Sequence, residues 1–189
     1  ARQIANVTVR NMGTIGGSIS FADPGLDYPP ALVAADARIE IASAAGRRTI
    51  AAHEFFVDWY TTALAPGEMV TAIELPAPRA GAGVYLKHAR VSGDYATVSV
   101  ALSIATTPQG LQTRAAIGAC GPRPLRSDEA DRLLSGTPSA ADIARAGALL
   151  QAAADPVDDV RGSADYRRLL IPRMLGEAVS RAQVSLARA

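Results

Sequence analysis

The chain of 189 residues carries 19 Lys and Arg against 18 Asp and Glu, and 49% of its residues are hydrophobic. This near-neutral balance is typical of a globular protein and gives no indication of nucleic-acid binding. One cysteine excludes an internal disulfide, one cysteine and two histidines cannot supply a four-ligand metal site, and no apolar run is long enough to span a membrane. We therefore expect a cytoplasmic protein with no metal site of its own.

The first part of the chain reads as short helices followed by a strand hairpin. In order, we expect the end of a helix running into a short strand (1–9), a glycine-rich loop (13–18), a helix opened by two prolines (29–35), a strand with its hairpin partner (38–41 and 48–51) and a further strand (69–75). Aromatic residues between 53 and 60 are expected to pack under the hairpin, with His53 at a helix start or on the surface.

A proline- and glycine-rich stretch at 76–83 is the best linker candidate and suggests a boundary between domains 1–78 and 79–189. Beyond it, three strands at 84–91, 97–106 and 111–120 are separated by short turns, which predicts an antiparallel meander. The second of these could also be a buried helix. The last third is predicted to be helical, with Ser127, Ser139 and Ser163 at three helix starts.

A stretch rich in glycine and polar residues, RNMGTIGGS at 10–18, is the strongest candidate for a functional site. It has neither the Walker ending nor the dinucleotide G-x-G-x-x-G spacing. Successive glycines at 16 and 17 let consecutive backbone N–H groups face one anion, and the hydroxyls of Thr14 and Ser18 can add hydrogen bonds. Taken alone, a Gly-Gly pair is more often a tight turn.

The complete pattern resembles a known family, the FAD-binding medium subunits of molybdenum hydroxylases, which includes the flavoproteins of aerobic carbon monoxide dehydrogenase and xanthine dehydrogenase. Motifs in the order of that family span nearly the whole chain: VRN at 9–11, TIGGS at 14–18, ADP at 22–24, Asp27, GE at 67–68, ELP at 74–76, Lys87, SGDYATV at 92–98 and DVRGSADYR at 159–167. The resemblance implies an α+β fold, with the second lobe of a PCMH-type FAD-binding domain followed by a C-terminal domain of a three-stranded antiparallel sheet and helices. The family's N-terminal lobe, with a further glycine-rich loop, is not part of this sequence, so we expect a fragment or processed product.

The resemblance also implies which residues contact FAD. Those residues are Thr14, Ile15, Gly16, Gly17, Ser18, Asp23, Asp27, Val70, Thr71, Lys87 and Tyr95. The glycines would meet the pyrophosphate or ribityl region, and the two aspartates would accept hydrogen bonds from ribityl or ribose hydroxyls. Lys87 and Tyr95 are expected near the isoalloxazine ring, and Val70 and Thr71 on a strand beside the flavin.

Each of these residues also has a simpler structural role open to it. Asp27 can cap the helix that follows it, Lys87 can be a surface charge and Tyr95 can lie at the rim of the core. The acidic residues at 155, 158 and 159 are expected to form a solvated loop that caps the next helix, because their spacing does not match a calcium loop.

By resemblance, the chain is expected to be the electron-transfer flavoprotein subunit of a complex. Its partners would be a large molybdenum-cofactor subunit and a small subunit with [2Fe–2S] clusters, in a heterotrimer or a dimer of heterotrimers. Electrons would reach FAD from the clusters and leave to an external acceptor. The alternative is a non-catalytic interaction or scaffold module that holds no FAD by itself.

Overall fold

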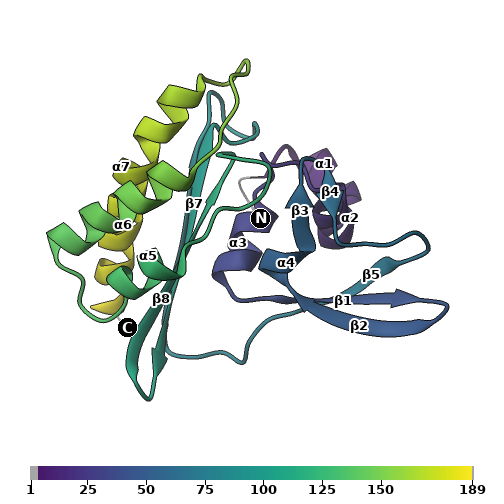
Figure 1. The fold of residues 1–189 in the computed structure, drawn as a ribbon, viewed down its shortest axis with the longest axis horizontal. Helices are drawn as coiled ribbons and strands as arrows, with labels where there is room; N and C mark the ends of the chain where they lie inside the picture. The colour runs from purple at the N-terminus through teal and green to yellow at the C-terminus, as the bar shows by residue number, and fades with distance from the viewer. Residues whose placement is uncertain (1–3, 189) are drawn as a thin grey trace.

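The computed structural model describes residues 4–188, which form an α+β fold with two three-stranded sheets and a short two-stranded sheet, β3-β4 (Figure 1). The helices are α1 (Val7–Met12), α2 (Ile15–Phe21), α3 (Tyr28–Ala34), α4 (Ala52–Phe55), α5 (Asp128–Leu134), α6 (Ala140–Ala153) and α7 (Ala164–Leu186). The strands are β1 (Arg38–Ser43), β2 (Gly46–Ala51), β3 (Phe56–Asp58), β4 (Thr61–Thr62), β5 (Met69–Glu74), β6 (Gly81–His88), β7 (Val98–Thr107) and β8 (Gly110–Gly118). Among these residues, no helix is both long and apolar enough to cross a membrane.

The antiparallel sheet β6-β7-β8 stands in the middle of the molecule and has two different faces. Val100 and its partner Ile117 belong to the core that the sheet forms with α5, α6 and α7, whereas Ala101 and its partner Ala116 belong to a second core with α3. Successive residues of a strand point to opposite faces. Large aliphatic side chains therefore meet the three C-terminal helices, which Figure 1 shows on one side of the sheet with α3 on the other.

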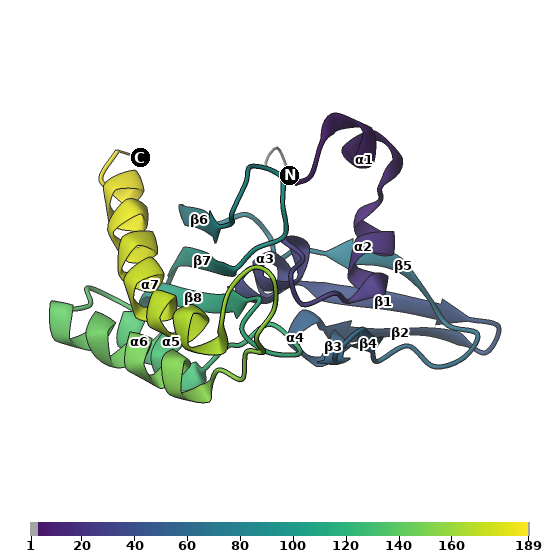
Figure 2. The same cartoon turned by 90° about the horizontal axis from the view of Figure 1, so that it is seen from above.

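A second antiparallel sheet, in the order β2-β1-β5, forms a smaller lobe with α2, α3 and α4. Its core is built on Ile39, Ile41 and Phe55, all fully buried, and on Val33 from α3. Figure 2 shows α1 and α2 leading into this lobe, with α1 projecting beyond the sheets. Helix α3 therefore belongs to the small lobe and also covers the central sheet.

Small residues allow α3 to lie close to the central sheet. Gly118, at the end of β8, is paired with Ser99 on β7. A Cβ atom at Gly118 would lie 2.9 Å from Cγ of Pro30 and closer still to the Ser99 hydroxyl. Such a distance is shorter than real Cβ contacts, so only glycine fits this position without a shift.

Most of the elements expected from the sequence are present. The α+β class, the hairpin of β1 and β2 and the meander β6-β7-β8 are confirmed, and β7 is a strand and not a buried helix. Ser127, Ser139 and Ser163 each accept a hydrogen bond from a backbone N–H in the first turn of α5, α6 and α7. The boundary between 1–78 and 79–189 stays a prediction.

Three expectations were wrong, and each concerns the first 60 residues. The described part of 1–9 ends in helix α1 and contains no strand, because Asn6 caps a helix that begins at Val7. The expected glycine loop contains the first turn of α2. The aromatic cluster is divided: Phe55 and Phe56 are buried, but Trp59 is 38% exposed and Tyr60 57% exposed.

Because the packing at Gly118 is close, the addition of one methyl group there should destabilise the protein. Gly118→Ala should lower the free energy of unfolding by about 1–3 kcal/mol, the usual effect of overpacking a core. Gly83→Ala is the matched control, since Gly83 lies in β6 of the same sheet and a Cβ there would have no neighbour within 4 Å. Urea unfolding of both variants measures the difference. Equal stability of the two would contradict this account of the α3 contact.

Candidate functional site

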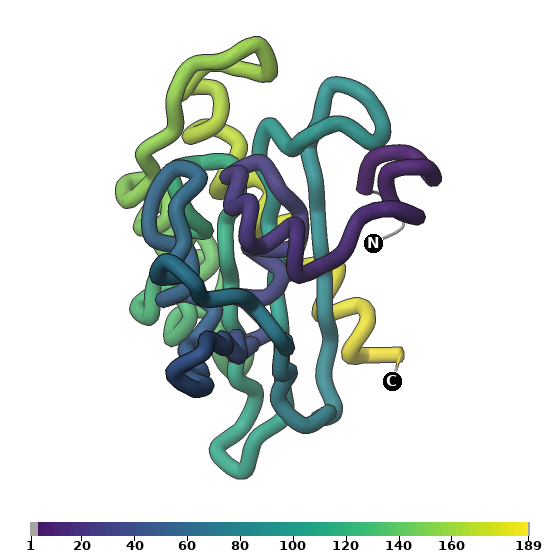
Figure 3. The backbone as a smooth tube through the Cα atoms, turned by 90° about the vertical axis from the view of Figure 1, so that its right-hand side faces the viewer, coloured from purple at the N-terminus to yellow at the C-terminus, as the bar shows by residue number. Residues whose placement is uncertain are grey.

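A cavity of about 750 Å³ brings together three segments that are far apart in the sequence. The segments are residues 4–18 around α1 and α2, residues 26–28 before α3, and residues 93–95 between β6 and β7. Gly93, with φ of +85°, lies so close to Ala5 that a Cβ would be 3.1 Å from the Ala5 carbonyl oxygen. Figure 3 shows the N-terminal segment and the β6–β7 connection at the same end of the molecule.

Six of the residues expected to contact FAD line this cavity: Thr14, Ile15, Gly17, Ser18, Asp27 and Tyr95. The other five expected contacts, at 16, 23, 70, 71 and 87, do not line it. The cavity is within the range of small-molecule sites, and its walls combine apolar side chains with a few polar groups.

The start of α2 supplies backbone N–H groups to one wall. Thr14 caps the helix: its hydroxyl accepts from the Gly17 N–H at 2.9 Å, and its carbonyl accepts from the Ser18 N–H at 3.0 Å. The N–H groups of Ile15 and Gly16 also belong to the first turn of α2. The first N–H groups of a helix have no partner inside the helix and favour an anion. The double glycine therefore acts in a helix start and not in a loop.

Arg10, which we did not predict as a site residue, adds a cation to the wall of the cavity. Its guanidinium donates to the carbonyls of Ile4 and Ala5 at 2.6 and 2.8 Å, which ties the N-terminal segment to α1. The sequence signal for this role was its place in the VRN motif, directly before the glycine stretch.

Asp27 is held by two side chains of β6. Its carboxylate accepts from the Tyr85 phenol at 2.5 Å and from the Lys87 ammonium at 2.9 Å. Tyr85 and Lys87 are two residues apart on one strand, so their side chains share a face. Burial and the neighbouring carboxylate raise the pKa of Tyr85 well above its usual range, so the phenol stays a donor.

These contacts rule out the simpler structural roles that were open to Asp27 and Lys87. Asp27 occupies the N-cap position of α3, but its side chain makes no capping hydrogen bond. Lys87 is not a surface charge, because its side chain is only 6% exposed. Lys87 also donates to the Asp94 carbonyl at 3.0 Å, which fixes the turn that carries Tyr95.

Asp23 faces a different, smaller cavity of about 100 Å³, and Tyr95 lines both cavities. One Asp23 oxygen accepts from the Gly25 N–H at 2.8 Å and the other accepts from the Tyr60 phenol at 3.2 Å. Asp23 therefore shapes the turn after α2. Burial raises the pKa of Tyr95, and the charge of Asp23 adds to this effect.

Val70 and Thr71 lie on β5, away from the cavity. Val70 packs against the core of the small lobe, and the Thr71 hydroxyl donates to the Glu40 carboxylate at 2.6 Å. Helix α2 packs against β5, which places this strand behind the helix that lines the cavity. A direct flavin contact of these two residues stays a prediction.

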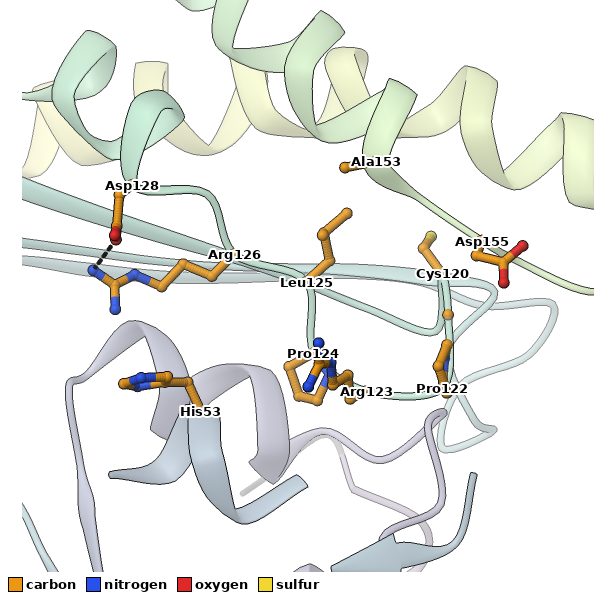
Figure 4. A pocket seen from close by; sticks show the side chains of 11 residues that line it. His53, Cys120, Pro122, Arg123, Pro124, Leu125, Arg126, Asp128, Ala153 and Asp155 are labelled. Atoms are coloured by element: carbon orange, nitrogen blue, oxygen red, sulfur yellow. Dashed lines mark ion pairs between the residues drawn. The ribbon is translucent and has the colours of Figure 1, made fainter. Parts of the chain in front are cut away.

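A further cavity of about 700 Å³ lies between α4, the loop after β8 and the start of α5, and Figure 4 shows its lining. His53 lies exposed on α4, as expected for a surface histidine. Arg126, on the facing loop, is paired with Asp128 at 3.1 Å and Asp131 at 2.7 Å. Burial raises the pKa of the Cys120 thiol to about 12, so it stays protonated and unreactive. None of the residues predicted to contact FAD lies here.

The acidic residues after α6 are structural. Asp158 accepts from the Ala164 N–H at 2.6 Å at the start of α7, as the capping interpretation predicted. Asp159 accepts from the Arg161 N–H at 2.7 Å and pairs with the buried Arg167. Across residues 4–188, no group of three or more His, Cys, Asp or Glu side chains is arranged to hold a metal ion.

Two family profiles match the chain. The family described as FAD binding domain in molybdopterin dehydrogenase matches residues 1–78, and the family described as CO dehydrogenase flavoprotein C-terminal domain matches residues 84–182. The chain belongs to the flavoprotein medium subunits of the molybdenum hydroxylases.

Known relatives agree with this assignment. The chain is 39% identical to the carbon monoxide dehydrogenase medium chain of Afipia carboxidovorans, over 95% of this chain and 64% of that protein. It is 38% identical to the glyceraldehyde dehydrogenase medium chain of Sulfolobus acidocaldarius, over 90% of this chain and 61% of that protein. A solved carbon monoxide dehydrogenase of Hydrogenophaga pseudoflava matches with a TM-score of 0.90 at 34% identity, covering 97% of this chain and 65% of that one. The chain therefore spans a little under two thirds of these relatives.

The buried Asp27–Lys87 pair predicts a large loss of stability when one partner is removed. Lys87→Met should lower the free energy of unfolding by about 3–5 kcal/mol, because it leaves a buried carboxylate without its cation. Arg47→Met is the matched control: Arg47 and Glu40 are 2.8 Å apart, but the Arg47 side chain is 69% exposed. Removing that exposed pair should cost at most about 1 kcal/mol.

Thermal and urea unfolding measure both variants. The double variant Asp27→Asn with Lys87→Met should recover part of the loss, since no charge is then left unpaired. A Lys87→Met variant as stable as Arg47→Met would contradict the importance of this pair.

Proposed function

We propose that the protein carrying this chain is an FAD-binding electron-transfer subunit of a molybdenum hydroxylase complex. The observation that carries the proposal is the convergence of the start of α2, Asp27 and Tyr95 on one cavity of about 750 Å³. These groups are far apart in sequence, and they are the residues through which the family resemblance assigns FAD. When bound, FAD supplies the redox chemistry, and the protein supplies position and electrostatics.

The cavity has chemistry that fits a dinucleotide. The N–H groups in the first turn of α2 and the cation of Arg10 favour a pyrophosphate. The Asp27 carboxylate keeps lone pairs for ribityl or ribose hydroxyls beside its bonds to Tyr85 and Lys87. The Tyr95 ring offers an apolar surface to a flat ring system.

The proposed partners come from the family resemblance, and the name 'medium chain' of the relatives supports them. Medium chains are named in enzymes that act on different molecules, including carbon monoxide and glyceraldehyde. We therefore propose a large molybdenum-cofactor subunit and a small iron–sulfur subunit as partners, in a heterotrimer or a dimer of heterotrimers in the cytoplasm. The substrate would be bound by the large subunit, outside this chain.

The first test is whether the purified protein holds FAD. We expect a flavin absorption band after reconstitution, with one FAD for each chain. We also expect FAD at a hundred times its dissociation constant to stabilise the protein by about 2.7 kcal/mol. Absorption spectra, equilibrium dialysis and thermal unfolding with and without FAD measure this. A protein with no band and no stabilisation would instead support the alternative of a scaffold module without flavin.

A pair of substitutions at Gly17 tests the place of the phosphates. A Cβ at Gly17 would lie 3.0 Å from the Thr14 hydroxyl, so any side chain disturbs the cap of α2 to a similar extent. Gly17→Asp and Gly17→Asn have nearly the same shape and differ by one negative charge. We expect FAD to bind at least about tenfold more weakly to Gly17→Asp than to Gly17→Asn, because like charges close together repel.

Titration of FAD into both variants, with thermal unfolding as a check on folding, makes this comparison. Equal affinities would show that no phosphate lies near Gly17, and would move the pyrophosphate away from the start of α2.

A further inference from the structure

The ring of Tyr95 forms a wall between the large cavity and the small one. Gly25 lies beside this ring, because a Cβ at Gly25 would be 3.4 Å from Cβ and Cδ1 of Tyr95. Tyr95 is 39% exposed, so packing alone leaves it room to change its orientation. Whatever lies in the small cavity therefore affects how the ring faces the large one.

Arg161 covers the ring within the small cavity. Its guanidinium carbon lies 5.1 Å from the centre of the Tyr95 ring. At this distance a cation is attracted by the negative face of an aromatic ring. Arg161 comes from the DVRGSADYR motif in the loop before α7, so a residue of the C-terminal part of the chain contacts the side chain that lines the proposed flavin site.

Two carboxylates lie near the Arg161 guanidinium. Its guanidinium lies 3.7 Å from Asp94 and 3.6 Å from Asp159, and its Nε atom is buried with no hydrogen bond to the described residues. These are ion pairs at long range and not tight hydrogen bonds. The position of Arg161 therefore depends on the ring as well as on the carboxylates.

Asp159 itself is fixed to the body of the protein. It pairs with Arg167, whose side chain is 4% exposed and donates to the carbonyls of Thr97 and Ala119 at 2.6 and 2.9 Å. Those carbonyls lie next to the start of β7 and the end of β8. The cation over Tyr95 is thus connected through Asp159 and Arg167 to the central sheet.

We propose that Arg161 is a positioning residue for the flavin: it holds the Tyr95 ring toward the large cavity and keeps a positive charge behind that ring. This inference rests on the proposed FAD site. Arg161 acts through Tyr95 and does not itself line the large cavity.

The proposal predicts an effect on the cofactor that exceeds any effect on folding. Arg161→Met keeps a long side chain but removes the charge. We expect about three- to tenfold weaker FAD binding, as the loss of a cation–π contact implies. We also expect a more negative flavin potential, because a nearby cation favours the anionic reduced flavin.

Arg90→Met is the matched control. Arg90 donates to the Val160 carbonyl at 2.8 Å, so it contacts the same loop beside Arg161, but it does not lie over Tyr95. If Arg161 only held the loop in place, Arg161→Met and Arg90→Met should change the FAD affinity and the flavin potential by similar amounts. In Arg161→Lys, which keeps the charge but loses the planar guanidinium, the potential should recover more than the affinity.

The experiment measures FAD affinity, flavin potential and melting temperature for the wild type, the two methionine variants and Arg161→Lys. A double variant with Tyr95→Leu tests coupling, since Arg161→Met should have little further effect once the ring is gone. Trp59, the only tryptophan of the chain, lines the same small cavity, and its fluorescence should change in Arg161→Met and not in Arg90→Met.

The outcomes separate the two proposals. A wild type that binds no FAD overturns the proposed function, and this inference with it. A wild type that binds FAD, with equal affinity and potential in Arg161→Met and Arg90→Met, overturns the role of Arg161 alone. Effects of Arg161→Met that persist undiminished in the Tyr95→Leu background also overturn it.

Discussion

The close approach of α3 to the central sheet is the constraint on which the candidate site depends. Pro30 lies against Gly118 on β8, and small side chains at Ser99 and Ala101 leave room for the helix. Asp27 directly precedes this helix, so the packing of α3 determines where its carboxylate meets β6. If a larger side chain at this contact displaced α3, Asp27 would move away from Tyr85 and Lys87. One wall of the cavity would then change as well.

The charged side chains near Tyr95 form a series of contacts in which positive and negative groups alternate. Arg167, Asp159, Arg161 and Asp94 form one series, and the Asp94 carbonyl then accepts from Lys87. Apart from Arg167, these side chains are about a third exposed, and such ion pairs add little net stability because solvent screens their attraction. These groups therefore serve mainly to define geometry: they fix the turn at 93–95 relative to the sheet without filling the cavity beside it.

The sequence predicted features that depend on neighbouring residues, and it did not predict contacts between residues that are far apart in the chain. The cap at Ser139 and the alternation in β1 depend on neighbouring residues, and both were predicted. Helix α2 was missed because a seven-residue segment with two glycines has low helix propensity, and only the cap by Thr14 and the packing around it make it a helix. The partners of Asp27 lie 58 and 60 residues away, and no spacing rule predicts such a pair.

The family resemblance and the geometry differ on which cation acts on the proposed flavin site. Resemblance assigns that role to Lys87, but its ammonium lies 2.9 Å from the Asp27 carboxylate, so much of its field is cancelled locally. Arg161 is paired more loosely, at 3.6 and 3.7 Å, and contacts the ring that lines the cavity. Arg161 opposes the negative charges of Asp23 and Asp94 at this ring, so its removal would leave the ring in a more negative environment. On this reasoning, Lys87 orients Asp27 and the turn before Tyr95, whereas Arg161 is the cation that contacts the ring itself.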